Sequence, residues 1–159
     1  MAYLIDGNNL LGHISAYALK DKGGRASLIG RLLSFQRMTG KRIHLVFDGR
    51  PPGDETRIEV NSKFTILYPE PGGNADLLIK ERIGNQNDKR HFFVVTTDRD
   101  LRDFAKAHGV KSLTCLEFNR ELKKVLREYG REKEMEKTFT FPSPLEVNLW
   151  KDVFRDKKR

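Results

Sequence analysis

Short apolar segments alternate with stretches of helical spacing along most of this chain, and no other feature of the sequence limits its fold as strongly. Each apolar segment is short enough for a buried strand, and together they are 3–5, 42–47, 64–68, 91–96 and 110–116. The stretches of helical spacing are 8–20, 28–39, 75–83, 98–108, 117–137 and a last one from Ser143. Because strands and helices alternate, the sequence predicts an α/β fold, a mainly parallel sheet with helices on both faces.

Several residues predict where these elements begin and end. Gly40 suits the position after a helix end, and Asn74 suits the N-cap of the next helix. Thr97, with Asp100 three residues later, resembles a capping box at the start of a further helix. The breaker-rich stretch 20–24 predicts an interruption between two helices, and 50–57 predicts a charged surface loop.

The composition is that of a basic protein with enough residues for a core. The chain has 159 residues, 30 Lys and Arg against 22 Asp and Glu, and a formal charge of +8. This surplus favours a polyanion such as nucleic acid as a partner. Cys115 is a lone cysteine, so it forms no internal disulfide and supplies no cysteine metal cluster. Because no signal-like or membrane-spanning apolar run is present, we expect a cytoplasmic protein without a membrane partner.

Acidic residues stand at the ends of three expected strands. Asp6, Asp98 and the reserve candidate Asp48 each follow an apolar run, and Asp76 lies in the first turn of an expected helix. In a parallel α/β fold these positions open on the edge of the sheet where ligands bind, so we expect their side chains to converge. Structural roles compete with this interpretation: Asp6 suits a turn, Asp76 suits a helix N-terminus, and Asp100 suits the capping box. Capping does not account for Asp98.

Converging carboxylates need compensation for their charge. Two of them about 4 Å apart repel by about 4 kcal/mol at an effective dielectric of about 20, so either some bind protons or a divalent cation lies among them. Carboxylate oxygens suit Mg²⁺ or Mn²⁺, and a hard cation in a basic protein fits hydrolysis of phosphodiester bonds. The glycine spacing of residues 7–15 resembles a P-loop, but His13 stands in place of the P-loop lysine, which argues against nucleotide hydrolysis.

Three motifs in this order resemble a known family. They are Asp6-Gly7-Asn8-Asn9, Gly72-Gly73-Asn74-Ala75-Asp76 and Thr96-Thr97-Asp98-Arg99-Asp100. Their order and spacing are similar to those of NYN domains in the PIN-like nuclease superfamily, most of all the YacP-like branch. The resemblance implies a metal-dependent endoribonuclease with a Rossmann-like (PIN-like) sheet. It also implies the site: the metal ligands Asp6, Asp76 and Asp98, with Asp100 as a fourth or supporting acid, and Asn9 orienting Asp6 or the substrate.

The resemblance leaves parts of the chain without a role. The loop 50–57 and the helix from Ser143 match no family motif. Asn8 lies inside the first motif, where relatives often have an aromatic or other residue before the second Asn, and it has no assigned role. We assign 1–137 to the nuclease domain and 138–159 to a linker and an amphipathic helix. That helix suits docking on its own domain, self-association or binding of a partner protein.

RNA is the expected partner, with mRNA presented by a ribosome as one form of it. The expected phosphate contacts are basic residues at the rim of the site: Arg50, Arg57, Lys63 and Arg99. A solvated loop accounts for the first three equally well. Two alternatives to the enzyme stay open, an RNA-binding module of the same fold that does not cleave, and a toxin-like nuclease controlled by a partner protein.

Overall fold

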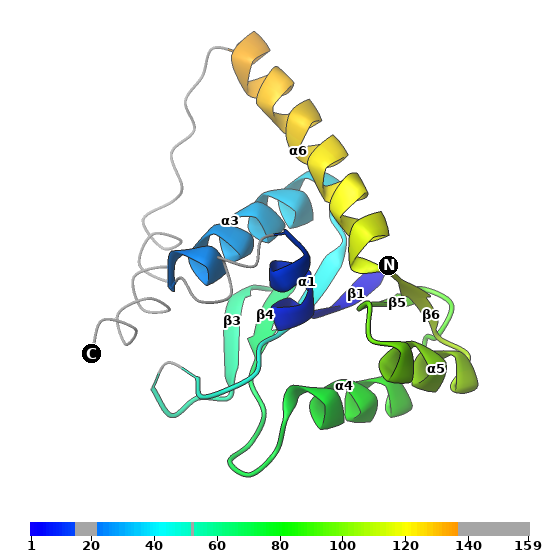
Figure 1. Cartoon of the computed structure of the whole chain (residues 1–159). Helices are drawn as coiled ribbons and strands as arrows, with labels where there is room; N and C mark the ends of the chain where they lie inside the picture. The colour runs from blue at the N-terminus through cyan, green and yellow to red at the C-terminus, as the bar shows by residue number, and fades with distance from the viewer. Residues whose placement is uncertain (15–21, 52, 137–159) are drawn as a thin grey trace.

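The computed structural model describes residues 1–14, 22–51 and 53–136, and a six-stranded sheet forms the centre of this part of the chain (Figure 1). The strand order is β3-β4-β2-β1-β5-β6. All neighbouring pairs are parallel except β3 and β4, which are antiparallel. The strands are β1 (Ala2–Asp6), β2 (Arg42–Val46), β3 (Arg57–Asn61), β4 (Phe64–Leu67), β5 (Phe92–Val95) and β6 (Lys111–Leu113). The predicted α/β fold is confirmed.

Helices cover both faces of the sheet, as Figure 1 shows. On one face lie α1 (Gly7–Ile14), α3 (Lys22–Thr39) and α6 (Cys115–Glu136), and on the other lie α4 (Ala75–Gly84) and α5 (Arg99–Ala107). Each face has its own buried apolar cluster because the side chains of β1 alternate: Ile5 joins the first cluster and Leu4 the second. Among the described helices, none combines the length and apolar character needed to cross a membrane.

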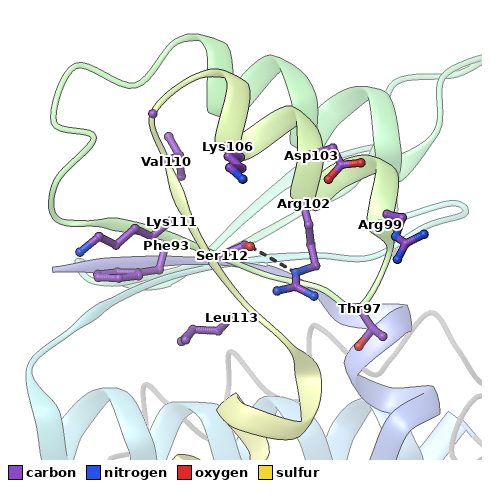
Figure 2. Close-up of a pocket in the computed structure, with 11 residues that line it drawn as sticks. Phe93, Thr97, Arg99, Arg102, Asp103, Lys106, Val110, Lys111, Ser112 and Leu113 are labelled. Atoms are coloured by element: carbon purple, nitrogen blue, oxygen red, sulfur yellow. Dashed lines mark hydrogen bonds between the residues drawn. The ribbon is translucent and has the colours of Figure 1, made fainter.

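The free edge of the sheet at β6 is partly covered by α5. Arg102 reaches from that helix toward the strand, and its Nε donates a hydrogen bond to Ser112 Oγ at 3.3 Å (Figure 2). In the register of the sheet, Lys111 lies beside Phe93 of β5, so these two side chains share one face. Successive residues of a strand point to opposite faces, so Ser112 points to the other face. The edge strand therefore has side chains of α5 on one side and the half-buried Phe93 on the other.

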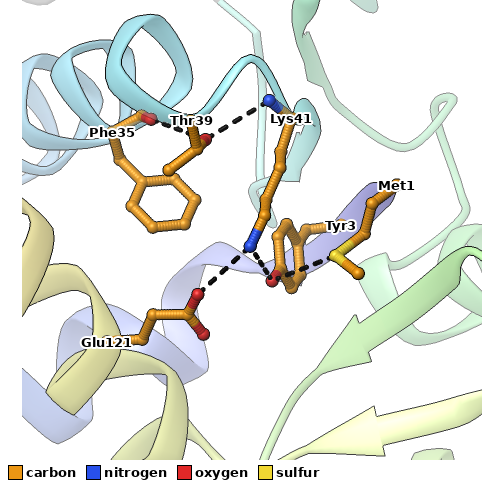
Figure 3. A network of polar contacts seen from close by, with 6 residues as sticks. All are labelled: Met1, Tyr3, Phe35, Thr39, Lys41 and Glu121. Atoms are coloured by element: carbon orange, nitrogen blue, oxygen red, sulfur yellow. Dashed lines mark hydrogen bonds and ion pairs between the residues drawn. The ribbon is translucent and has the colours of Figure 1, made fainter.

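An aromatic cluster fastens α3 and α6 to the sheet. The rings of Tyr3, Phe35 and Phe118 meet edge to face with centroids 5.4–6.0 Å apart, a geometry that adds about 0.5–1.5 kcal/mol per pair beyond burial. At the rim of this cluster, Lys41 Nζ donates to Tyr3 Oη at 3.3 Å and to Glu121 Oε1 at 3.2 Å (Figure 3). Lys41 precedes β2, so this network lies at the amino edge of the parallel strands.

The starts of β3 and α3 differ from those expected, and the end of α3 agrees. The sequence predicted a loop up to residue 57, but β3 begins at Arg57. Its polar and apolar residues alternate, and it forms an edge strand that pairs with β4 around a bulge. The interruption expected at 20–24 is wrong for Gly23 and Gly24, because α3 already begins at Lys22. Both glycines lie in the first turn of the helix, where amide groups lack helical partners in any case. The expected C′ position of Gly40 is confirmed, with φ of 69° and its N–H bonded to Gln36 O.

The start of α6 is set by a capping box that the sequence analysis overlooked. Thr114 Oγ1 accepts from Glu117 N–H at 3.1 Å, and Glu117 Oε1 accepts from Thr114 N–H at 3.2 Å. The last strand therefore ends at Leu113, and Cys115 is a helical residue, not a strand residue. The second half of the helix expected at 8–20 and the C-terminal segment expected at 138–159 lie outside the described residues.

Candidate active site at the carboxyl edge of the sheet

Asp6 is the buried acid of the candidate site. It ends β1 between the strands β2 and β5, and only 7% of its surface is exposed. Thr96 Oγ1 donates to its Oδ2 at 3.1 Å, and Asn9 N–H donates to its Oδ1 at 3.5 Å. Burial raises the pKa of Asp6 to about 6; the two hydrogen bonds oppose this shift, and the charges of Asp76 and Asp98 add to it. The buried position at the end of β1 thus disfavours the ionised form of Asp6 relative to a carboxyl group in water.

Asp98 caps helix α5, which corrects two expectations. Its side chain accepts hydrogen bonds from Asp100 N–H at 2.9 Å and Leu101 N–H at 3.4 Å, so Asp98 and not Thr97 is the N-cap. Capping therefore accounts for Asp98 after all. It does not exclude a second role, because a carboxylate has more acceptor sites than these two bonds use.

Thr96 links the two acids, a role that is not predicted from the sequence. The residue is fully buried, its hydroxyl donates to Asp6, and the same oxygen accepts from Asp98 N–H at 3.1 Å. A hydroxyl at the end of an apolar strand was the available signal, since a buried hydroxyl requires a partner. Thr96 thus fixes the strand end of β5 to that of β1.

Asp76 lies in the first turn of α4, on the exposed side of the helix. The predicted N-cap of this helix is confirmed, because Asn74 Oδ1 accepts from Leu77 N–H at 2.9 Å. Partial desolvation raises the pKa of Asp76, and the carboxylate of Asp98 raises it further. The ammonium of Lys80 opposes this shift. Asp76 and Asp98, far apart in the sequence, are therefore close enough to interact through their charges.

Lys80 brings a positive charge to this acidic edge. Its Nζ lies 2.8 Å from Asp100 Oδ2, and Asp100, Asp76 and Asp98 all raise its pKa, Asp100 most through the hydrogen bond. The side chain of Asp100 therefore pairs with Lys80 and does not complete the expected capping box. The spacing of Asp76 and Lys80, four residues apart on one helix, was the overlooked signal.

Gly7 allows the first helix to start directly against the neighbouring strand. A Cβ atom at this position would lie 2.7 Å from Val46 O and 2.8 Å from the ring of Phe47. Such contacts are closer than any side chain tolerates, so glycine is required for this approach. The approach places the two asparagines that follow beside the ends of β2 and β5.

The two asparagines hold neighbouring loops. Asn9 Oδ1 accepts from Thr97 N–H at 2.7 Å and from Cys115 Sγ at 2.9 Å, while its own N–H meets Asp6. Asn8, which had no expected role, accepts from Asp48 N–H at 3.2 Å through Oδ1. The side chain of Asp48 in turn accepts from the first amide of α4 at 3.4 Å. These contacts make Asn8, Asn9 and Asp48 parts of the frame that positions Asp6, Asp76 and Asp98.

The acids share one edge but are less crowded than expected. Within the described residues, no three carboxylate, histidine or cysteine side chains are already arranged to hold a metal ion. Burial, not mutual repulsion, is the largest cause of the raised pKa of both Asp6 and Asp76. The donor set, carboxylate oxygens alone, nevertheless fits a hard cation by its chemistry, and a positive charge there would offset the cost of ionising Asp6.

The expected phosphate contacts are placed on different sides of the molecule. Arg99 is exposed and directly follows Asp98, and Arg50 is exposed in the loop after β2. Arg57 is the first residue of β3 and pairs with Glu59 at 3.0 Å. Lys63 corrects the expectation of a common rim: it precedes β4, and its Nζ donates to Gly40 O, at the amino edge opposite to Asp6.

The mainly parallel sheet makes this an α/β domain with acidic residues at its carboxyl edge, and the family match makes it a nuclease-type domain. Residues 3–157 match the sequence model of the YacP-like NYN domain, and the chain belongs to that family. The match includes the loop 50–57 and the segment from Ser143 that the three motifs left unassigned.

Two solved structures share the fold. A crystal structure of a point mutant of Rae1 (YacP) from Bacillus subtilis is 22% identical and covers 99% of this chain and 97% of its own, with a TM-score of 0.68. A second structure of Rae1 from the same organism is 19% identical, covers 99% of this chain and 92% of its own, and has a TM-score of 0.66. No curated protein sequence matches the chain.

Proposed function

We propose that this protein is a metal-dependent endoribonuclease that hydrolyses RNA phosphodiester bonds. The observation that carries the proposal is the buried carboxylate of Asp6, held by Thr96 at a strand end where Asp76 and Asp98 interact with it through their charges. The nuclease-type family and the formal charge of +8 support the same conclusion. RNA, mRNA included, is the substrate class that we propose.

Asp6, Asp76 and Asp98 are the residues that would hold Mg²⁺ or Mn²⁺. A bound cation of this kind supplies a polarised phosphate and an activated water. The rest of the frame is built to position these acids: Thr96 orients Asp6, and Asn9 fixes the loop that carries Asp98. Asp100 is engaged by Lys80, which makes it a supporting acid in this proposal and not a principal ligand.

Incubation of RNA with the protein and Mn²⁺ tests the proposal directly. We expect cleavage by the unmodified protein and at least a hundredfold slower cleavage by Asp6→Asn, because the variant loses a carboxylate that would hold the cation. Asp54→Asn is the matched control, since Asp54 is an exposed acid in the loop before β3. Equal cleavage by Asp6→Asn and Asp54→Asn, or cleavage unaffected by EDTA, would overturn the proposal.

An RNA-binding module without cleavage is the second candidate. The observation in its favour is that the described acids are not already arranged around a metal position. If RNA binds equally to the unmodified protein and to Asp6→Asn, and neither cuts it with Mg²⁺ or Mn²⁺, this second candidate is correct. Control by a partner protein or self-association would act through the C-terminal segment, which lies outside the described residues, and a cytoplasmic location stays an expectation.

A further inference from the structure

A basic groove runs along the free edge of the sheet, beside the acidic site. Its cavity volume is about 830 Å³, within the size range of ligand sites. One side of the groove is formed by α5, and Phe93, Lys111 and Leu113 lie across the edge strand β6 from that helix (Figure 2). The first residue of the groove, Thr97, is the direct neighbour of Asp98. The groove therefore begins where the candidate active site ends.

Cations dominate the polar lining of this groove. Three of them follow one face of α5 at helical spacing, the fourth comes from β6, and a single carboxylate accompanies them: Arg99, Arg102, Lys106 and Lys111, with Asp103. Four cations and one acid leave a formal +3. In the described part of the chain, none of the four cations forms an ion pair. Arg102 donates to Ser112 Oγ and acts on Glu117 through its charge, so Arg99, Lys106 and Lys111 carry most of the charge available to a ligand.

We propose that this groove binds the backbone of single-stranded RNA and leads it to the acidic edge. The proposal rests on the proposed function in taking RNA as the ligand, and it assigns a binding role to Arg102, Lys106 and Lys111. The three cations of α5 extend over about 10 Å, seven residues at a rise of about 1.5 Å each, which suits a run of successive phosphates. They lie on the side of Asp98 away from Asp6 in the strand order.

The apolar part of the lining favours a single strand over a duplex. Half-buried Phe93 and Leu113 lie with Lys111 on the face of the sheet away from α5, where the ring of Phe93 packs against Tyr3 with centroids 5.8 Å apart and keeps part of its surface in the groove. Single-stranded nucleic acids are bound where cations follow the backbone and an aromatic ring is available for an unstacked base, whereas a duplex keeps its bases stacked inside. A peptide added to the sheet edge is the competing occupant, but β6 has only three residues and offers it a short ladder.

Two matched pairs of substitutions test the groove. Lys106→Gln with Lys111→Gln neutralises it, and Lys123→Gln with Lys124→Gln removes the same charge from exposed positions of α6. Binding of a fluorescein-labelled oligouridylate of about 12 nucleotides is followed by anisotropy in EDTA, so that cleavage does not interfere. Each lost phosphate contact on a single strand corresponds to about 0.7 of a decade in affinity at about 0.1 M salt.

We expect the groove pair to weaken binding about 25-fold and to make the salt dependence shallower by about 1.4 in slope, for two lost contacts. The α6 pair should weaken binding several-fold less, Lys106→Arg with Lys111→Arg should restore it, and a duplex of equal length should compete poorly. Equal weakening by both pairs, unchanged binding by the groove pair, or no RNA binding at all would overturn the proposal. Melting curves followed by circular dichroism establish that the variants are folded.

The groove and the nuclease proposal fail separately in this design. If RNA binding depends on the groove but the protein does not cleave RNA with Mn²⁺, the groove proposal is supported and the nuclease proposal is wrong. If the protein cleaves RNA but its RNA binding does not depend on Lys106 and Lys111, the nuclease proposal is supported and the groove proposal is wrong. A peptide partner is then the remaining occupant for the sheet edge.

Discussion

Replacing Asp6 by asparagine should stabilise the protein at alkaline pH and not at acidic pH. The pKa of Asp6 is about 6 in the folded chain against an ordinary value of 3.8, because its carboxyl is buried at the end of β1. Between these two pH values the folded state holds a proton that the unfolded chain has released. Stability therefore falls as the pH rises from about 4 to 6, and the loss stays constant above that range.

The size of the effect follows from the difference of 2.2 between the two pKa values. At about 1.36 kcal/mol per unit, ionised Asp6 lowers the free energy of unfolding by about 3 kcal/mol at pH 8. An asparagine carries no charge, but Thr96 and Asn9 N–H donate to different oxygens of Asp6, Oδ2 and Oδ1, so the single Oδ1 of asparagine keeps only one of these two bonds. Its amide group requires a new partner, so we expect a net gain of about 1–2 kcal/mol at pH 8.

Urea denaturation at pH 8 and pH 4, followed by circular dichroism in EDTA, measures this gain. We expect Asp6→Asn to exceed the unmodified protein at pH 8 and to lose that advantage at pH 4, while Asp54→Asn differs little at either pH. With Mn²⁺ in place of EDTA, the unmodified protein should gain stability and Asp6→Asn should not, because a cation binds the folded carboxylate. A variant less stable than the parent at pH 8, or a difference independent of pH, would refute the link between burial and charge.

Four further outcomes follow from the structure. Burial, with nearby arginines, lowers the pKa of His44 to about 4, so the contribution of His44 to stability should fall by about 3 kcal/mol as the pH drops from about 6.5 to 4, opposite in sign to the contribution of Asp6. The difference in urea midpoint between the unmodified protein and His44→Gln, measured at both pH values, isolates this contribution. Gly7→Ala should lower the free energy of unfolding by about 1–3 kcal/mol, measured by urea, because its Cβ would meet Val46 O; an unchanged midpoint contradicts this. Asp98→Asn should keep the helix cap, whereas Asp98→Ala should lower the free energy of unfolding by about 1 kcal/mol. Both variants should cleave RNA at least a hundredfold more slowly than the unmodified protein. Full activity in the asparagine variant would leave capping as the only role of Asp98. Lys80→Ala should bind Mn²⁺ several-fold more tightly in calorimetric titration, since an ammonium repels the ion, and weaker binding would show that Lys80 organises the acids.

The features predicted correctly from sequence are those that local periodicity encodes. Apolar runs and helical stripes gave the α/β fold, and the three motifs gave the family. Asn74 was recognisable as an N-cap because a cap needs only its own helix. Thr97 was the wrong cap by one residue, since the choice depends on where β5 ends, and that end is set by pairing with β1 and β6.

Apart from the local capping box of Thr114 and Glu117, the features that sequence reasoning missed depend on contacts between distant segments. Thr96 meets Asp6 across 90 positions, and Lys80 meets Asp100 across 20. Local patterns also placed Lys63 at the wrong edge, because the direction of β4, which Lys63 precedes, is fixed only by its parallel pairing with β2. The distances between the acids were also not predictable from the sequence. They depend on the register of the strands and on where each helix begins, and not on spacing along the chain.

Asp98 and the cations of α5 belong to one rigid element, and this has a consequence for how the two sites can influence each other. Asp98 caps the helix whose exposed face carries Arg99, Arg102 and Lys106. Phosphates bound by these side chains would therefore be held at a fixed distance from the acidic edge, because helix geometry and the Thr96 bridge leave α5 little freedom to shift. Neutralising the groove would then weaken binding of RNA without altering how bound RNA meets the carboxylates, whereas disturbing Thr96 would displace both together.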